Sequence, residues 1–412
     1  MSAGFQRQSG ELVCDGVSLT ALARQFGTPL YVYSWAAIEE RFRRFDAAFA
    51  SVPHLVCYAA KANSNLAILT RLAAIGSGAD VVSGGELRAA LQCGIAADRV
   101  VFSGVGKTDA EIAAGVDAGI FAFNAESERE IEKIDAIAGG RGVRARVALR
   151  VNPDIDARSH PYISTGLKQN KVGVDIGRAP EIFERARAIR TLRMDGIQAH
   201  IGSQILEAGP LAATARDLAA LADTLAGAGS PIESLDIGGG IGIGDGALSP
   251  EAYAAAVLPA LTGRPGRVLI EPGRAIAGAA GVLLARVEYV KQESGKNFVV
   301  VDAGMNDLLR PALYQACHNV EFVDATPRNR TFVADIVGPV CETADSFLND
   351  ARIAEPREGD ILAIRDVGAY GFAMASNYNF RARPAEVLVE NGAALLVRRR
   401  ENYEDLIRTE LV

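Results

Sequence analysis

The sequence predicts an α/β fold: a (β/α)8 barrel of the TIM type, followed by a second domain built only of β-strands. Between residues 55 and 273, eight short β-rich runs alternate with amphipathic helix-like segments, which is typical of a parallel sheet closed into a barrel. Beyond residue 274 the pattern changes to strand-like alternation, with Gly, Asn and Asp at the turns and little helix. A chain of 412 residues is long enough for two hydrophobic cores.

The barrel strands are predicted from runs that are rich in apolar and β-branched residues. In chain order these runs are LVCYAA (55–60), GADVVS (78–83), VVFSG (100–104), IFAFN (120–124), RVALRVN (146–152), GIQAHIGS (196–203), SLDIGGG (234–240) and RVLIEPG (267–273). The segments at 65–76, 84–94, 108–119, 126–138 and 211–228 have apolar residues at helical spacing. The alternative is an open, doubly wound sheet, which would bind ligand at one switch point only, whereas here nearly every strand end is polar.

The second domain is predicted from later runs of alternating residues. They are VLLARVEYVKQ (282–292), NFVVVDAG (297–304), RTFVADIVGP (330–339), DILAIRDVGAYG (360–371) and AEVLVENGAALLVRR (385–399). The N-terminal runs ELVCDGVSLT (11–20) and TPLYVYS (28–34) are also strand-like, and we expect them to pack with this domain. The expected boundaries are therefore 34–273 for the barrel, and 1–33 with 274–412 for the β domain.

The composition favours small-molecule partners. A formal net charge of −7 and the lack of a Lys/Arg cluster argue against binding to nucleic acid. The N-terminus has no apolar segment, and the longest apolar stretch, near residues 275–285, is too short to span a bilayer. We therefore expect a cytoplasmic protein with no membrane partner. The five cysteines form no CxxC pair and the four histidines lack ligand spacing, so neither a disulfide framework nor a metal site is expected.

Residues just past the strands of a barrel converge on one face, where active sites of this fold lie. Five strand ends carry candidate residues: Lys61 and Asn63; Asp80, Ser83 and Glu86; His200, Gly202 and Ser203; Gly238, Gly239 and Gly240; Glu271, Gly273 and Arg274. Lys61 follows an apolar run, and a desolvated lysine can attack a carbonyl group. Taken alone, Lys61 is better explained as an exposed lysine that closes a strand, and the other strand ends favour the catalytic interpretation.

The two last strand ends indicate a phosphate site. Gly238 to Gly240 would let backbone N–H groups approach a phosphate at the position where barrels usually bind one, although a turn with positive φ explains glycines as well. In EPGR, Glu271 suits a pyridinium nitrogen, and Arg274 suits a carboxylate or phosphate. An ion pair within the chain is the alternative for these two residues, and a hydrogen-bonded interior histidine is the alternative for His200.

These motifs resemble a known family. YAAKAN around Lys61, HIGSQ around His200, GGG and EPGR are similar to the fold-type-III pyridoxal-phosphate decarboxylases. Within that group, TGLKQNKVG (165–173), VDAGMNDLLRPALY (301–314), GPVCET (338–343) and GAYGFAMASNYN (368–379) resemble the diaminopimelate decarboxylases. The resemblance implies a barrel with a β domain, pyridoxal 5'-phosphate as cofactor, and loss of one carboxylate from meso-diaminopimelate to give L-lysine and CO2, the last step of lysine biosynthesis.

The resemblance also implies residue roles. The expected catalytic residues are Lys61, which holds the cofactor, His200, which stacks on its ring, Glu271, which bonds its ring nitrogen, and Cys341, which returns a proton. The other expected cofactor-binding residues are Ser203, Gly238, Gly239, Gly240, Pro272, Gly273, Arg274 and Tyr370. The expected substrate-binding residues are Arg274, Arg310, Tyr314, Glu342 and Tyr370. The sequence departs mildly from the family pattern at Ala60 and Thr343.

The resemblance further implies a homodimer, because Cys341 and Glu342 in this family complete the partner's active site. The main alternative is a sister decarboxylase that acts on ornithine, arginine or carboxynorspermidine with the same cofactor. A non-catalytic pyridoxal-phosphate carrier would not need the C-terminal domain. A metal-dependent barrel hydrolase would need His and Asp ligands at several strand ends, where His200 is the one histidine.

Overall fold

The structure is a computed structural model that describes residues 4–156, 171–293, 295–324 and 330–411. Residues 165–170, which carry most of the TGLKQNKVG motif, therefore lie outside the described residues. The chain divides into two compact units. The barrel unit is Glu40–Ala275, and the β unit combines Met1–Glu39 with Ile276–Val412.

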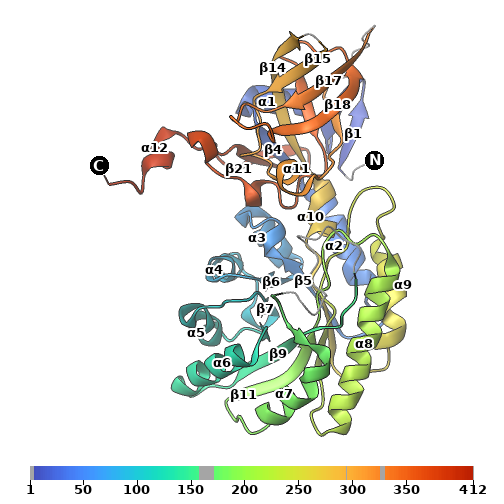
Figure 1. The fold of residues 1–412 in the computed structure, drawn as a ribbon, viewed down its shortest axis with the longest axis vertical. Coiled ribbons are helices and arrows are strands. Elements are labelled where there is room, and N and C mark those ends of the chain that lie inside the picture. Colours follow the sequence, from blue (N-terminus) through green and yellow to red (C-terminus); the bar gives the residue numbers. More distant parts are fainter. Residues whose placement is uncertain (1–3, 157–170, 294, 325–329, 412) are drawn as a thin grey trace. The chain divides into compact units, whose positions relative to one another are not determined.

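The barrel unit is a closed parallel sheet (Figure 1). Its strands are β5 (His54–Ala59), β6 (Gly78–Val81), β7 (Val100–Phe102), β8 (Ala122–Ala125), β9 (Ala145–Asn152), β11 (Leu192–Gln198), β12 (Ser234–Asp236) and β13 (Arg267–Ile270). Each strand pairs with the next along the chain, apart from the short β10 (Val174–Asp175) at the edge of β9, and β13 pairs with β5 to close the ring. Every predicted barrel run overlaps one of these strands, so the predicted barrel is confirmed.

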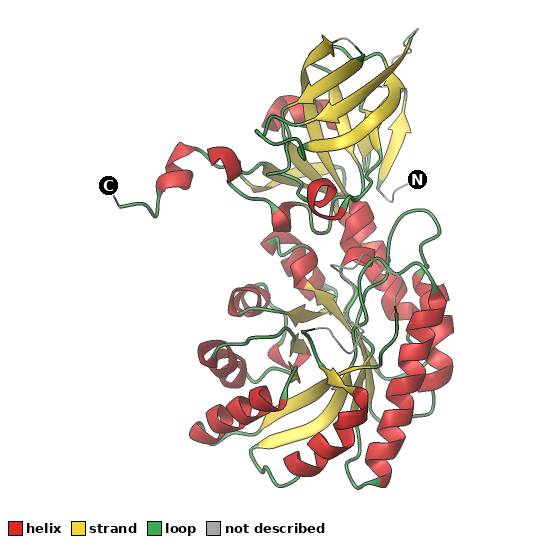
Figure 2. Ribbon diagram, viewed as in Figure 1, coloured by secondary structure: helices red, strands yellow, loops and turns green. Residues whose placement is uncertain are grey.

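Helices follow the barrel strands and cover them on the outside (Figure 2). They are α3 (Leu66–Ala74), α4 (Gly84–Gln92), α5 (Asp109–Ala118), α6 (Glu128–Gly140), α7 (Ala179–Ala186), α8 (Ala208–Gly227) and α9 (Pro250–Leu261). Side chains of Asn65, Ser83, Thr108, Ser127 and Ser249 cap the starts of α3, α4, α5, α6 and α9 by accepting backbone N–H groups. The predicted helices are confirmed, and α7 and α9 are two further helices for which we made no prediction.

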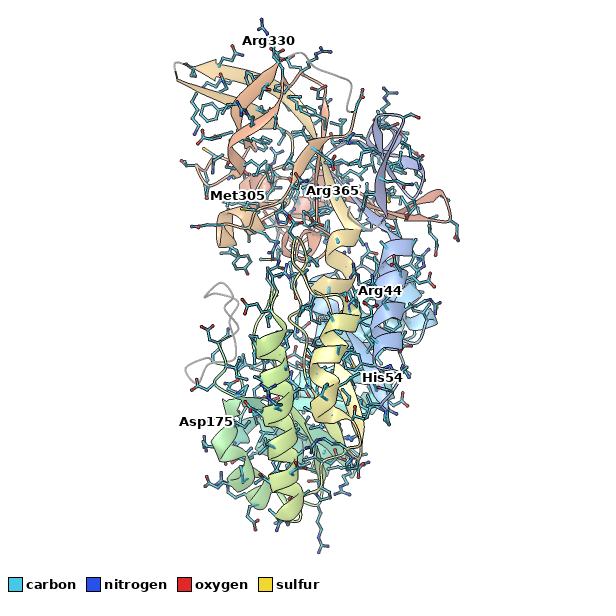
Figure 3. The ribbon with its side chains drawn as sticks, turned by 90° about the vertical axis from the view of Figure 1, so that its right-hand side faces the viewer. Arg44, His54, Asp175, Met305, Arg330 and Arg365 are labelled. Carbon is cyan, nitrogen blue, oxygen red and sulfur yellow. The ribbon has the colours of Figure 1, made fainter. Side chains whose placement is uncertain are left out.

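Helix α2 (Trp35–Ala48) precedes the first barrel strand and is held to neighbouring elements by ion pairs. Arg44 donates two hydrogen bonds of 2.8 Å to the carboxylate of Glu251 on α9. His54, at the start of β5, lies 3.2 Å from Asp46. Figure 3 labels Arg44 and His54, which come from these adjoining elements. Such partly exposed pairs add little stability.

The β unit is mostly sheet. Its larger sheet runs in the order β18 (Ser346–Ala354), β17 (Thr331–Val337), β15 (Lys296–Val301), β14 (Gly281–Glu293), β4 (Leu30–Ser34), β20 (Ala385–Glu390) and β21 (Ala393–Arg398), with β19 (Ile361–Ile364) on β14 and β16 (Val320–Phe322) on β19. A smaller sheet contains β1 (Phe5–Gln8), β2 (Glu11–Cys14) and β3 (Val17–Ser18). Because β4 pairs with both β14 and β20, the predicted union of N-terminal strands with this domain is confirmed.

The prediction of an all-β domain needs one refinement. Three α-helices also belong to the β unit: α1 (Leu19–Phe26), α11 (Arg310–Tyr314) and α12 (Tyr403–Ile407). Helix α1 begins at Ser18, whose hydroxyl accepts the Ala21 N–H, and it packs Leu19 and Leu22 into the core of the unit. The strands β16 and β18 were also not predicted, since β18 has a mixed burial pattern without clean alternation.

Candidate active site

The carboxyl ends of four barrel strands carry the predicted residues of this unit. Lys61 lies in a short turn, Ala60–Ala62, directly after β5, and His200 follows β11. The glycine run follows β12, and Glu271 follows β13. Because parallel strands of a closed barrel end on one face, the fold places these residues on the same face.

Lys61 forms an ion pair inside the barrel mouth. Its Nζ donates a hydrogen bond of 2.6 Å to Oδ2 of Asp80, at the third position of β6. The Asp80 side chain is fully buried, whereas the Lys61 side chain is 29% exposed. The other carboxylate oxygen of Asp80 is buried and has no hydrogen-bond partner among the described residues. The pair therefore holds the amine at the barrel mouth while leaving it accessible to a small molecule.

Glu271 lies in a buried polar cluster. Its Oε1 accepts hydrogen bonds from Asn124 Nδ2 at 3.2 Å and from Ser103 Oγ at 3.5 Å, and its Oε2 accepts one from Gln198 Nε2 at 3.3 Å. The same Asn124 Nδ2 donates to Oδ2 of Asp236, the last residue of β12, at 3.5 Å, so the carboxyl of Asp236 belongs to this cluster. Desolvation, followed by the charges of Asp236 and Asp80, raises the pKa of Glu271 well above its ordinary value.

This cluster fits a cationic ring nitrogen. Among the described residues, no Lys, Arg or His nitrogen forms an ion pair with Glu271 or Asp236, although both carboxyl groups are buried. A buried carboxylate without a cation is costly, so the cluster would gain stability from a positive group that enters from the barrel mouth. A protonated pyridine nitrogen is such a group, and the nearby Lys61 amine is the one that pyridoxal phosphate requires.

His200 is held as a neutral imidazole. The backbone N–H of Gly239 donates a 3.2 Å hydrogen bond to His200 Nδ1, which must therefore be the unprotonated nitrogen. Desolvation, then the positive charges of Lys61 and Arg150, lower the pKa of His200 well below its ordinary value of 6.5. A neutral, oriented ring of this kind suits stacking on a flat cofactor better than hydrogen-bonding to an anion.

The glycines after β12 are required by the backbone itself. Gly238 and Gly240 have φ of +67° and +90°, and a Cβ on Gly239 would lie 2.0 Å from the carbonyl oxygen of Glu271. The Gly238 N–H donates to Asp236 Oδ1 at 2.9 Å, so the turn and the carboxyl cluster are joined. Glycine is therefore needed here for both positive φ and the close approach of two strand ends.

Further contacts order the site's rim. Arg274 Nη2 donates a 3.0 Å hydrogen bond to Ser203 Oγ, which links the end of β13 to the end of β11. Arg150, on β9, donates to Glu126 at 2.9 Å and to the carbonyl oxygen of His200 at 3.4 Å. Gly273 lies close to β5, since a Cβ there would come 2.9 Å from the Cβ atoms of Ala59 and Ala62. These contacts fix the ends of β5, β9, β11 and β13 relative to one another.

The remaining predicted residues lie in the β unit. Cys341 and Glu342 are both exposed, and the Cys341 N–H donates to Asn379 Oδ1 at 3.0 Å. The Tyr378 hydroxyl donates a hydrogen bond to Glu342, which raises the pKa of Tyr378. The loop that carries Cys341 is thereby joined to the segment around residues 377–380.

Arg310 and Tyr314 lie at the two ends of α11. The buried Arg310 guanidinium sits 5.5 Å from the centroid of the Tyr314 ring, a cation–π contact. Tyr370 has a left-handed backbone conformation, with φ of +56°. It lies in a tight turn between Gly368 and Gly371. Its strained conformation belongs to a loop whose shape is set by close contacts, since a Cβ on Gly371 would lie 2.4 Å from the Val367 carbonyl oxygen.

Asp345 links two of these loops. Its Oδ2 accepts the Val340 N–H and its Oδ1 accepts the Met305 N–H, each at 2.6 Å. Val340 immediately precedes Cys341, and Met305 belongs to the loop that leads into α11 and Arg310. The Asp345 side chain thereby fixes the Cys341 loop to the Arg310 loop within the β unit.

Our sequence reasoning missed several buried polar residues of the barrel. These are Ser103, Asn124, Arg150, Gln198 and Asp236, and Asp80 was noted at a strand end without a role. The available signal was a polar residue inside an apolar strand, as in IFAFN, GIQAH and SLDIG. A polar side chain that interrupts a buried strand needs a partner, which indicates a polar cluster in the core.

The described residues provide neither a membrane-spanning helix nor a metal-binding cluster. No helix in that part of the chain has both the length and the apolar character needed to cross a membrane. The same residues contain no group of three or more His, Cys, Asp or Glu side chains arranged to hold a metal ion.

Comparisons with known proteins agree with this site. The model of the family described as pyridoxal-dependent decarboxylase, pyridoxal binding domain, matches residues 35–278. Diaminopimelate decarboxylase of Aquifex aeolicus is 46% identical over 411 residues, which cover 99% of this chain and 97% of the relative. Its counterpart in Neisseria meningitidis serogroup A is 49% identical over 404 residues, which cover 97% of this chain and 99% of the relative.

Solved structures agree equally well. The structure of diaminopimelate decarboxylase from Helicobacter pylori complexed with L-lysine has a TM-score of 0.92 and 43% identity, and covers 95% of this chain and 98% of its own. The structure of diaminopimelate decarboxylase from M. jannaschii in co-complex with L-lysine has a TM-score of 0.95 and 38% identity. The match covers 100% of this chain and 98% of the M. jannaschii chain. The amine of Lys61 and the buried Glu271 carboxyl are thus in a chain that matches these proteins nearly end to end. The chain belongs to the pyridoxal-phosphate-dependent decarboxylases and, within them, to the diaminopimelate decarboxylase family.

Proposed function

We propose that this protein decarboxylates meso-2,6-diaminopimelate to L-lysine and CO2, the last step of lysine biosynthesis, with pyridoxal 5'-phosphate as cofactor. The observation that carries the proposal is the pairing, on one barrel face, of an accessible lysine amine with a buried carboxyl cluster that lacks a cation. The nearly full-length similarity to diaminopimelate decarboxylases, some of them solved with L-lysine, supports this substrate.

Each barrel residue has a proposed task around the cofactor. When bound, pyridoxal phosphate supplies a ring that can accept the electron pair left on Cα after CO2 departs. Lys61 would hold its aldehyde carbon, His200 would stack against the ring, and Glu271 would keep the ring nitrogen positive by its own charge. The phosphate is proposed to be held by Ser203, Gly238, Gly239, Gly240, Pro272, Gly273, Arg274 and Tyr370.

The substrate's two charged ends determine specificity in this proposal. Arg274, Arg310, Tyr314, Glu342 and Tyr370 are proposed to bind its distal carboxylate and ammonium groups. A substrate without the distal carboxylate would lack the anion that these side chains are proposed to bind, which weakens its binding. Cys341 is proposed to return a proton from its thiol to Cα once CO2 has left.

We further propose a homodimer in which Cys341 and Glu342 serve the partner's site. Both side chains are exposed in the single chain, so they are available to a second copy. A reducing location such as the cytoplasm is also proposed, and three buried free thiols, those of Cys14, Cys57 and Cys93, are compatible with it.

The test is to follow CO2 and lysine release from purified protein and to repeat the assay with Lys61→Ala. We expect the variant to lose at least roughly a thousandfold in activity and to lose the absorbance of bound cofactor. Lys133→Ala is the matched control, since Lys133 also pairs with an aspartate, Asp109 at 2.7 Å, but on the surface. An active, yellow Lys61→Ala protein would refute the proposal.

The sister substrates provide the second arm of this test. We expect the rate constant kcat/KM for meso-diaminopimelate to exceed those for ornithine, arginine and carboxynorspermidine by about a hundredfold or more, because each of these leaves the distal site wrongly paired. Faster CO2 release from any of the three would reassign the substrate while leaving the cofactor chemistry in place.

A further inference from the structure

Asp236 and Glu271 are two carboxylic acids in contact within the barrel core. Asn124 Nδ2 donates to Asp236 Oδ2 at 3.5 Å and to Glu271 Oε1 at 3.2 Å, so the two carboxyl groups lie side by side, and the residues are only 2% and 3% exposed. A hydrogen bond between two carboxyl groups requires that one of them keeps its proton, because two carboxylates have no donor between them.

Among the described residues, no cationic side chain is hydrogen-bonded to the pair to offset a second ionisation. The side-chain donors to the pair are neutral: Asn124 reaches both carboxyls, and Gln198 and Ser103 reach Glu271. Asp80 adds a further negative charge nearby, and it is paired with Lys61, whose positive charge favours ionised Glu271.

Two other titratable groups face the pair, and both stay neutral. The Cys57 thiol lies on β5 and the Tyr253 hydroxyl on α9, and burial raises the pKa of each well above its ordinary value. Desolvation also raises the pKa of Asp236, to about 6. A single negative charge on the pair is thus the state that the buried cluster tolerates.

We propose that Asp236 is a positioning residue: it shares one proton with Glu271 and thereby holds the Glu271 carboxyl toward the cofactor's ring nitrogen. In the protein without cofactor, the two carboxyl groups share one proton and one negative charge. Next to a cationic ring nitrogen, the negative charge is drawn to Glu271, so the proton moves to Asp236, which becomes the donor. The pair keeps one proton and one negative charge throughout.

The contacts of Asp236 explain why it can position Glu271. Its Oδ1 accepts the Gly238 N–H at 2.9 Å, which fixes the carboxyl at the start of the glycine turn. Its other oxygen, Oδ2, accepts a hydrogen bond of 3.5 Å from Asn124 Nδ2 in the same cluster. A short side chain anchored to the backbone in this way leaves one hydrogen-bonding position for Glu271. This inference rests on the proposed role of Glu271 in binding the ring nitrogen.

The first test uses the full-length protein with the cofactor removed. The pKa of each carboxyl is raised in the fold, so the stabilising protonated state is complete at low pH and is lost as pH rises through the folded values. We expect the Tm of the wild-type protein to fall between about pH 5 and pH 8 more steeply than that of Asp236→Asn, which lacks one of the two acids. Asp195→Asn is the control, because Asp195 is also buried but is ion-paired with Arg146. Equal slopes for wild type and Asp236→Asn would overturn the proposal.

The second test uses the cofactor-loaded protein. An amide at position 236 can still accept from Gly238 and donate to Glu271, whereas leucine can do neither. We expect Asp236→Asn to bind pyridoxal phosphate within about threefold of wild type, and Asp236→Leu to bind it about tenfold or more weakly. In infrared spectra of the loaded protein, the band of a protonated carboxyl group should be present in wild type and reduced in Asp236→Asn.

The outcomes separate this inference from the proposed function. Equal loss of affinity in the Asn and Leu variants, or an infrared band unaffected by Asp236→Asn, would refute the shared proton while leaving decarboxylation intact. If wild-type protein bound no pyridoxal phosphate, the proposed function would fail first. Because Asp236→Asn nearly preserves side-chain shape, the pH and infrared measurements remain decisive even if Asp236→Leu does not fold.

Discussion

The amine of Lys61 and the carboxylate of Asp80 form an ion pair of 2.6 Å between the first two strands of the barrel. Asp80 is fully buried, so its charge depends on Lys61 for compensation. Glu86, on α4, is a neighbour whose pKa is raised, first by burial and also by the Asp80 charge. The pair thus fixes where the lysine amine stands relative to the cluster around Glu271.

Replacing Asp80 with Asn is expected to reduce activity and to weaken retention of the cofactor. The amide cannot offset the lysine charge, so Lys61 would leave its position, and we expect kcat/KM to fall roughly ten- to hundredfold. Asp109→Asn, which breaks the surface pair with Lys133, should change activity about twofold at most. Similar losses in both variants would mean that burial of the Asp80 pair has no special role.

Replacing Gly239 with Ala is expected to destabilise the protein. The added Cβ would lie 2.0 Å from the Glu271 carbonyl oxygen, so the ends of β12 and β13 would have to separate. We expect Tm to fall by about 5 °C, together with weaker binding of pyridoxal phosphate. Gly85→Ala is the control, because its Cβ would meet nothing closer than 3.7 Å and alanine favours the helix, so Tm should stay within about 2 °C. A stable Gly239→Ala protein would show that the strand ends can part at little cost.

Replacing His200 with Asn should change how stability depends on pH. The folded pKa of His200 lies well below 6.5, so the neutral ring's contribution is present above that value and is lost as pH falls below it. Asparagine can still accept the Gly239 N–H but does not titrate. We therefore expect the Tm of wild type, relative to His200→Asn, to decline between pH 7 and pH 5. Parallel Tm curves across this range would contradict the lowered pKa.

Replacing Asp345 with Asn should loosen the two loops that it joins. Its two carboxylate oxygens accept the Val340 and Met305 N–H groups, and an amide can accept only one of them. We expect Tm to fall by a few degrees and, under the proposed function, kcat to fall roughly tenfold. Asp350→Asn is the control in the same hairpin, since Asp350 is 79% exposed. Normal kcat in a destabilised Asp345→Asn protein would limit Asp345 to a structural role.

The elements of the barrel were predictable because they depend on local patterns. A run such as LVCYAA is buried on both faces in a parallel sheet, and helical spacing of apolar residues marks the segments between runs. Segments with weak periodicity were missed for the same reason, as β18 shows with its mixed burial. The N-terminal strand β4 was anticipated as part of the β domain from its composition, but its place between β14 and β20 was not.

The sequence by itself determined the order of strands and helices, the lysine, glycine and glutamate at the strand ends, and the family to which they belong, because each is written in short contiguous motifs. Only the tertiary structure decided which buried polar residues meet. Asp236 and Glu271 are far apart in the chain, and Asn124 reaches Glu271 across 147 positions. Such contacts depend on how the barrel closes, and the free energy of a buried charge depends on every group around it, so no local pattern specifies them.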